Sequence, residues 1–204
     1  MIYPPVCGIC GKINENFLCI KCRKNINECE KINKESVQNM EFEDLFYLFK
    51  YSGEIRKKII EYKFLEKSYL YKTFIAFFKT KELKYFREYD FIIPVPISRK
   101  RLKERGYNQS LLIAKEMSKM YKIRLSKRNL IKNKNNVAQS TLGKEERARN
   151  VINAYEVKNS KDIYDKKILL IDDILTTGNT VNECAKILKK YGAKKVDVFV
   201  IAKD

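Results

Sequence analysis

Apolar residues in the second half of the chain form short runs that alternate with segments of helical periodicity. Phe91–Val95, Lys167–Ile171 and Val196–Ala202 are apolar and of strand length, and we expect them to be buried strands. Residues 107–121 and 180–191 each place apolar side chains on one helical stripe. Strands that alternate with helices predict an α/β fold, a parallel sheet covered by helices on both faces.

The first half of the chain has a different pattern. Residues 45–51 read as a strand, and residues from 54 onward have helical spacing, whereas the polar residues 24–40 read as a linker or an irregular helix. We therefore expect three parts. They are a cysteine-rich unit at residues 1–28, a hood-like α+β segment at 41–88, and the α/β core at 89–204.

The charge of the chain favours an anionic partner. Its 43 Lys and Arg outnumber its 25 Asp and Glu, for a formal net charge of +18, and it has no histidine. Nucleic acid, a phosphorylated small molecule or a membrane surface would fit, although a solvated lysine-rich surface explains the same excess. No apolar run is long enough to cross a membrane and no signal-peptide pattern is visible, so we expect a cytoplasmic protein.

Four of the six cysteines form two Cys-x-x-Cys pairs near the start of the chain: Cys7 with Cys10, and Cys19 with Cys22. Four thiolates satisfy tetrahedral zinc and leave no open position, which predicts a structural zinc finger. A redox pair is the alternative, but it needs only one Cys-x-x-Cys beside a βαβ unit. Cys184 lies on the core-facing stripe of the last helix and is expected to be structural.

The segment from Ile168 to Thr180 carries the clearest chemical signal. An apolar strand leads into two carboxylates, then a Thr/Gly turn, then a helix. Backbone N–H groups at such a turn converge on an anion, and the threonine hydroxyls add donors. Asp172 and Asp173 can accept hydrogen bonds from vicinal ribose hydroxyls, directly or through Mg²⁺.

This segment resembles the signature of type I phosphoribosyltransferases. The resemblance implies a type I phosphoribosyltransferase-like α/β fold that binds phosphoribosyl pyrophosphate with Mg²⁺. It assigns the ribose hydroxyls to Asp172 and Asp173. It assigns the 5-phosphate to the turn residues, which are Thr176, Thr177, Gly178, Asn179 and Thr180.

Two further segments follow from the same resemblance. In that fold the loop after the first core strand holds pyrophosphate, which here implies Ser98, Arg99 and Lys100. These residues begin a basic run that, by itself, fits a solvated surface equally well. The polar segment near residues 133–147 is expected to be a loop that closes over the ligand. Its candidate contacts are Gln139, Lys144 and Arg147.

The combination of motifs is similar to the ComF family of competence proteins. The resemblance rests on the cysteine pairs, the Pro-Val-Pro segment at residues 94–96, the Arg-Gly-Tyr-Asn-Gln segment at 105–109, Gln139 with Arg147 and Asn150, and the phosphate turn. The family usually has Phe where this chain has Tyr107. The resemblance implies a role in uptake of transforming DNA, with DNA-uptake proteins as partners, and it leaves open whether the protein catalyses a reaction.

Three functions remain open at this stage. The first is the handling of single-stranded DNA by a protein that also binds phosphoribosyl pyrophosphate. The second is a nucleobase phosphoribosyltransferase of purine or pyrimidine salvage, and the third is a non-catalytic sensor of phosphoribosyl pyrophosphate. Aromatic residues set among lysines could stack on DNA bases, but their helical spacing fits a hydrophobic core better. These residues are Tyr62, Phe64, Tyr69, Tyr71, Phe74, Phe77 and Phe78.

Overall fold

A computed structural model describes residues 4–26, 32–77, 86–133 and 154–204. Its centre is a six-stranded sheet with the order β1-β2-β8-β7-β3-β4. All neighbouring strands are parallel except the β1/β2 pair, which is antiparallel. The strands are β1 (Asn33–Ser36), β2 (Asp44–Lys50), β3 (Phe91–Pro94), β4 (Arg124–Leu125), β7 (Lys167–Leu175) and β8 (Lys195–Lys203). The expected mixed α/β fold with a parallel sheet is confirmed.

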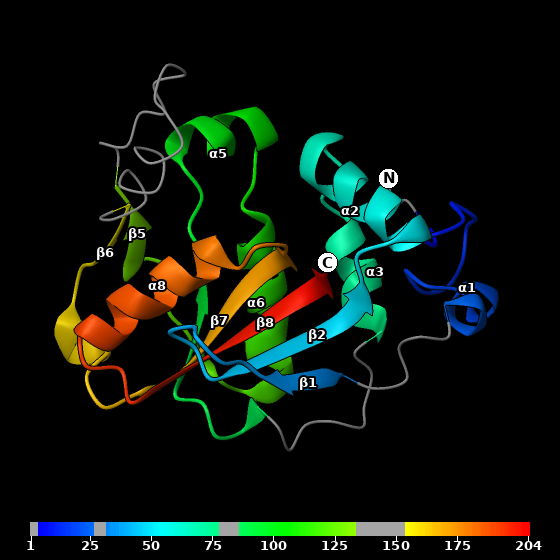
Figure 1. Cartoon of the computed structure of the whole chain (residues 1–204). Helices are drawn as coiled ribbons and strands as arrows, with labels where there is room; N and C mark the ends of the chain where they lie inside the picture. Colours follow the sequence, from blue (N-terminus) through cyan, green and yellow to red (C-terminus); the bar gives the residue numbers. More distant parts are fainter. Residues whose placement is uncertain (1–3, 27–31, 78–85, 134–153) are drawn as a thin grey trace.

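Helices cover both faces of the sheet (Figure 1). One face packs against α8 (Asn179–Lys190). The other packs against α2 (Gly53–Phe64), α3 (Leu70–Phe77) and α6 (Gln109–Tyr121). Side chains alternate along β7: Ile168 and Leu170 lie on the face covered by α8, whereas Leu169 and Ile171 lie on the opposite face. Both faces of the central strands are therefore apolar, as a doubly covered parallel sheet requires.

A short helix, a separate pair of strands and a 3₁₀ turn lie outside the main sheet. The helix α5 (Arg99–Arg105) follows β3, and the strands β5 (Leu130–Lys132) and β6 (Tyr155–Val157) form a separate antiparallel pair. The 3₁₀ turn η2 (Ser160–Asp162) follows β6. The β6 strand packs against α8, so the pair stands beside the last helix rather than in the main sheet (Figure 1).

The N-terminal unit packs against α3. It contains the cysteine pairs and the short helix α1 (Ile20–Asn25). Gly8 lies so close to α3 that an added Cβ would stand 2.2 Å from the Thr73 hydroxyl oxygen. That hydroxyl donates a hydrogen bond to the carbonyl oxygen of Phe17, at 2.9 Å. A side chain at position 8 would therefore push this unit away from the rest of the protein.

Two expectations need correction or refinement. The interpretation of residues 24–40 as a linker or helix was wrong at residues 33–36, which form the edge strand β1. Its polar residues alternate between exposed and half-buried positions, so the apolar pattern of a buried strand is missing. Tyr62, Phe74 and Phe77 are buried in the core and offer no stacking surface for bases, whereas Phe64 is exposed. Phe78 lies outside the described residues.

The described helices include none with the length and apolar character needed to cross a membrane.

Candidate functional site

The strand β7 ends in a turn whose side chains face a cavity. Gly178 caps α8 with a φ of 76°, a left-handed conformation that glycine adopts without strain. The side chains of Thr176, Thr177, Asn179 and Thr180 are exposed. All of these residues line the cavity, together with Asp172 and Asp173. The turn therefore presents its donors to an open space beside the carboxylates.

The two carboxylates have different partners. Asp172 accepts hydrogen bonds from the Ser110 hydroxyl at 2.8 Å and from the backbone N–H of Asp173 at 2.9 Å. Asp173 forms an ion pair with Lys63 of α2, with 2.9 Å between Nζ and Oδ1. Helices α2 and α6, which lie far apart in sequence from β7, thus each contribute one polar group to the pair.

The pKa of Asp172 is raised to about 7. Burial is the main cause and the nearby charge of Asp173 is the second, while the Ser110 hydrogen bond and the charge of Lys63 oppose both. Lys63 pairs with Asp173, whereas Asp172 has hydrogen bonds but no ion pair among the described residues. Carboxylate oxygens of this kind fit Mg²⁺.

The cavity has a volume of about 360 Å³, within the usual range for small-molecule sites. Arg101 and Arg105 of α5 also line it. Gln109 lines it as well: its Oε1 accepts a hydrogen bond from Arg105 at 3.2 Å. Its Nε2 is buried and has no hydrogen-bond partner within the described part of the chain. A buried amide without an acceptor is costly, and a ligand oxygen in the cavity would supply one.

Comparison with known proteins shows what this chain is similar to. Residues 108–204 match the family described as phosphoribosyl transferase domain. Competence protein F of Haemophilus influenzae is 27% identical over 208 residues, which cover 98% of this chain and 85% of that protein. The chain is thus similar to ComF-type competence proteins over nearly its whole length, and its second half matches a phosphoribosyl transferase domain.

Two further comparisons cover less of the molecules. The DNA utilization protein YhgH of Escherichia coli O6:H1 is 31% identical over 114 residues, 56% of this chain and 49% of that protein. Among solved structures, the glutamine phosphoribosylpyrophosphate amidotransferase of Bacillus subtilis is 19% identical with a TM-score of 0.40. That match covers 55% of this chain and 22% of the amidotransferase.

The three residues that the sequence assigned to pyrophosphate lie at different places in the structure and outside the cavity at Asp172. Ser98 caps α5, because its hydroxyl accepts a hydrogen bond from the backbone N–H of Arg101 at 3.2 Å. Arg99 lines a neighbouring cavity, and the exposed Lys100 is 4.0 Å from Glu104. None of these three lines the cavity at Asp172 among the described residues. The loop candidates Gln139, Lys144 and Arg147 lie outside the described residues.

Sequence reasoning missed the contribution of α2. Lys63 reaches Asp173, and Tyr62 donates a hydrogen bond to the backbone carbonyl of Gln109 at 2.8 Å. Tyr107 donates its hydroxyl hydrogen to the backbone carbonyl of Tyr62. This hydroxyl therefore adds a hydrogen bond between α2 and the segment before α6. No local signal in the sequence marks Lys63 among so many lysines.

The sulfur atoms of the four N-terminal cysteines lie close together. The sulfur atoms of Cys7, Cys10, Cys19 and Cys22 all lie within 4.8 Å of one another. Tetrahedral zinc with Zn–S bonds of about 2.3 Å needs sulfurs about 3.8 Å apart, and the Cys10 and Cys19 sulfurs are 3.9 Å apart. The backbone N–H of Cys22 donates to the Cys19 sulfur at 3.4 Å. This set fits a structural zinc ion, and the buried Cys184 is remote from it in the core beside α8.

Proposed function

We propose that this protein binds phosphoribosyl pyrophosphate with Mg²⁺ in the cavity at Asp172 and Asp173, and handles single-stranded DNA during natural transformation. The observation that supports the first half is one cavity that is lined by two adjacent carboxylates and by a turn rich in N–H and O–H donors. The names of the relatives, a competence protein and a DNA utilization protein, support the second half.

The ligand would lie along the cavity in a defined direction. The 5-phosphate would bind the turn from Thr176 to Thr180, where backbone donors and hydroxyls meet the N-terminal end of α8. The ribose hydroxyls would donate to Asp172 and Asp173. Mg²⁺, when bound, neutralises part of the pyrophosphate charge and gives the two carboxylates a cationic partner.

The pyrophosphate would lie towards α5. Arg101 and Arg105 line that side of the cavity and carry the positive charge that a pyrophosphate group needs. The unpartnered Nε2 of Gln109 lies on the same wall and would donate to a ligand oxygen. The assignment of Ser98, Arg99 and Lys100 to pyrophosphate stays a prediction, to which the cavity adds these three residues.

A binding titration tests the phosphate end of the site. Isothermal calorimetry with phosphoribosyl pyrophosphate and MgCl₂ should show saturable binding to the wild-type protein. The double variant Thr176→Val/Thr177→Val removes two hydroxyl donors and keeps the side-chain shape, so affinity should fall about tenfold or more. Ser160→Ala, an exposed change in η2, is the matched control and should bind as the wild type does. Equal affinity of all three proteins would contradict the assignment.

Two assays separate the proposed role from its alternatives. In a host whose own ComF-type gene is replaced, the Thr176→Val/Thr177→Val variant should give a lower transformation frequency than the wild-type protein. Pyrophosphate release across a panel of nucleobases tests for salvage chemistry. Release with one base, without an effect on transformation, would favour a nucleobase phosphoribosyltransferase. A protein that acts on incoming DNA and also binds a cytoplasmic metabolite is expected to work in the cytoplasm.

A further inference from the structure

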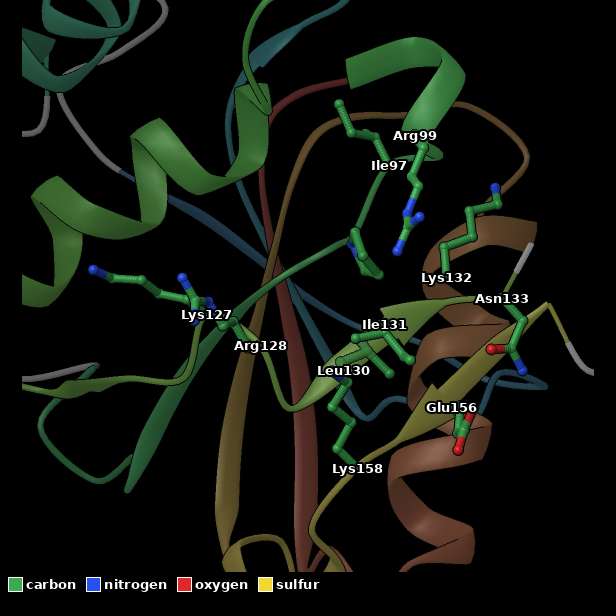
Figure 2. Close-up of a pocket in the computed structure, with 11 residues that line it drawn as sticks. Ile97, Arg99, Lys127, Arg128, Leu130, Ile131, Lys132, Asn133, Glu156 and Lys158 are labelled. Atoms are coloured by element: carbon green, nitrogen blue, oxygen red, sulfur yellow. The ribbon is translucent and has the colours of Figure 1, made fainter. Parts of the chain in front are cut away.

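A second cavity, of about 650 Å³, adjoins the first and is strongly basic (Figure 2). Five of its lining residues are cationic and one is acidic, whereas the whole chain has 43 cationic residues to 25 acidic ones. The cations come from the start of α5, the segment after β4, and the ends of β5 and β6. They are Arg99, Lys127, Arg128, Lys132 and Lys158, and the acid is Glu156. We call these five residues the basic row.

No member of the basic row forms an ion pair in the part of the chain that the structure describes, although Glu156 lines the same cavity. Many other lysines of the protein form ion pairs, such as Lys63 with Asp173 and Lys195 with Asp197. None of the ion pairs between described residues involves a member of the row. Cations gathered without partners raise the local positive potential and attract a polyanion.

The shape of the row suits a chain of phosphates better than a single one. Figure 2 shows Arg99 and Lys132 beside the space between α5 and the β5/β6 pair, while Lys127 extends away on the other side of the cavity. A binding site for one phosphate needs donors that converge on a point. Cations spread along a surface instead match a backbone that carries one charge per nucleotide.

The row leads into the cavity at the carboxylates. Pro96, Ile97 and Lys132 line both cavities, so the two spaces share a wall. Lys132 is half-buried at this junction, where its Nζ donates to the Tyr155 hydroxyl at 3.4 Å. A strand that follows the row would therefore arrive beside Asp172 with one extended end.

We propose that the basic row binds the phosphodiester backbone of single-stranded DNA and directs one end of the strand to the cavity at Asp172 and Asp173. This inference rests on the proposed function and adds the surface on which the DNA lies. A single strand is the occupant because the cavity at Asp172, of about 360 Å³, has the size of a small-molecule site and can admit one extended strand end but not a duplex. No aromatic residue lines the basic cavity within the described residues, so binding should be electrostatic and independent of sequence.

Salt-dependent DNA binding tests the basic row. Fluorescence anisotropy with a labelled thirty-residue oligo-dT measures affinity between 50 and 200 mM NaCl for the wild type and for Lys127→Gln/Arg128→Gln/Lys158→Gln. These three residues lie outside the cavity at Asp172. Each lost phosphate contact should flatten the slope of log affinity against log salt by about 0.7, so about 2 in total. Affinity should fall about tenfold or more.

A second triple variant removes the same charge elsewhere. Lys57→Gln/Lys186→Gln/Lys190→Gln changes exposed lysines of α2 and α8 that line neither cavity. Its affinity and salt slope should match those of the wild type. Equal losses in both triple variants would overturn the basic row, because net charge alone would then explain binding. Duplex DNA that binds as tightly as oligo-dT would overturn the preference for single strands.

The test also separates this inference from the proposed function. Calorimetry with phosphoribosyl pyrophosphate and MgCl₂ on the same proteins reports the first cavity. Binding of that ligand together with unchanged DNA affinity in the Lys127 triple variant would overturn the row and leave the ligand site standing. The opposite result would overturn the ligand site instead. In that case the wild type binds oligo-dT, the Lys127 triple variant loses DNA affinity as expected, and the wild type does not bind phosphoribosyl pyrophosphate.

Discussion

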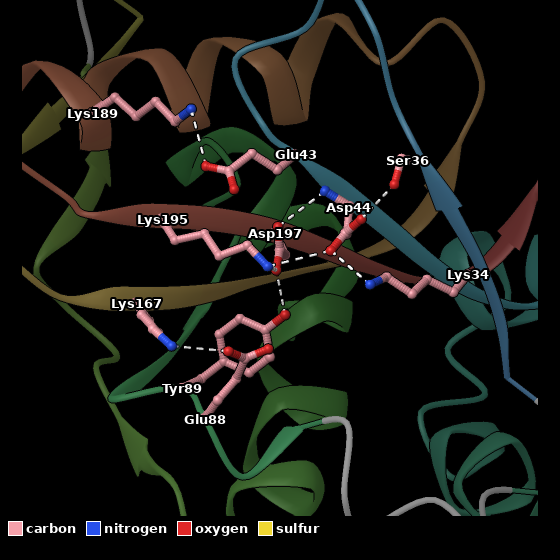
Figure 3. A network of polar contacts seen from close by, with 10 residues as sticks. All are labelled: Lys34, Ser36, Glu43, Asp44, Glu88, Tyr89, Lys167, Lys189, Lys195 and Asp197. Carbon is pink, nitrogen blue, oxygen red and sulfur yellow. Dashed lines mark hydrogen bonds and ion pairs between the residues drawn. The ribbon is translucent and has the colours of Figure 1, made fainter.

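Two pairs of carboxylates lie towards opposite ends of the same sheet, and their surroundings differ. Asp44 and Asp197 lie near the beginning of β2 and β8 and belong to a polar network (Figure 3). Asp197 is fully buried and pairs with Lys195 at 2.7 Å, with the Tyr89 hydroxyl, and with the backbone N–H of Asp44 at 2.9 Å. Asp172 and Asp173 lie near the other end, beside a cavity.

The difference lies in how much positive charge each pair receives. Burial opposes ionisation of Asp44, yet hydrogen bonds from Lys34, Ser36 and Lys195 lower the pKa of Asp44 below its usual value. At the other pair, burial and the charge of Asp173 raise the pKa of Asp172 to about 7. Lys34 and Lys195 pair with Asp44 and Asp197, whereas Asp172 has no ion pair among the described residues. We take this contrast as support for the proposed ligand role of the second pair.

Removing Asp197 should have the largest effect on stability. Asp197→Ala leaves Lys195 without its buried partner and the Tyr89 hydroxyl without its acceptor, so the free energy of unfolding should fall by about 3–5 kcal/mol. Urea unfolding at pH 7 measures this, and the exposed change Asp162→Asn serves as the control. A loss below about 1 kcal/mol would mean that the network is not the structural pair we infer.

Replacing Asp172 should have the opposite sign. Because folding raises the pKa of this carboxyl from 3.8 to about 7, the folded protein binds the proton more tightly, and stability falls as pH rises from about 4 to about 7. Asp172→Asn mimics the protonated form. The full difference would be worth about 4 kcal/mol, and solvent access near the cavity reduces the expected gain to about 1–2 kcal/mol.

Urea unfolding of ligand-free wild type and Asp172→Asn at pH 4, 6 and 8 measures that gain. The two proteins should have equal stability near pH 4 and diverge as pH rises. A variant that is less stable than the wild type at pH 8 would show that the carboxylate is a structural group, and the contrast between the two pairs would fail.

Lys63→Met should sharpen the comparison by removing the only lysine that pairs with Asp173 among the described residues. The charge of Lys63 holds the pKa of Asp172 down, so its loss should raise that pKa further and lower stability at pH 8 by about 1 kcal/mol. A double-mutant cycle with Asp173→Asn measures the coupling. A coupling energy near zero would mean that the ion pair contributes nothing in solution.

The smallest effect on stability is expected at the edge of the polar network around Asp44 and Asp197. Glu88 and Lys167 form an ion pair at 2.9 Å with both side chains partly exposed. Glu88→Gln should change the free energy of unfolding by no more than about 0.5 kcal/mol, and added salt should reduce the change. A larger loss would extend the structural network beyond its buried members.

The sequence predicted the functional end of the sheet better than the structural end. The turn from Thr176 to Thr180 and its two aspartates are local in sequence, so their order alone indicates an anion site. The apolar runs that became β7 and β8 are visible for the same reason. The edge strand β1 escaped notice because it is polar and is stabilised by pairing with β2, which no local pattern reveals.

Contacts between distant segments explain the other omissions. Lys63 meets Asp173 across more than a hundred residues of chain, and Asp44 receives Lys195 in the same way. Arg101 and Arg105 belong to a basic run in which the sequence does not distinguish cavity-lining positions from solvated ones. The turn of α5 after Ser98 decides that Arg101 and Arg105 line the cavity while Lys100 does not.

The central claim is that Asp172, which has no ion pair among the described residues, and Asp173 bind a magnesium-bound sugar phosphate. Calorimetric titration of phosphoribosyl pyrophosphate with MgCl₂ into wild type and into Asp172→Asn/Asp173→Asn tests it most directly, with circular dichroism to confirm folding. The double variant should remain folded and lose about a hundredfold in affinity, about 2.7 kcal/mol. A folded double variant that binds the ligand as tightly as the wild type would contradict the claim.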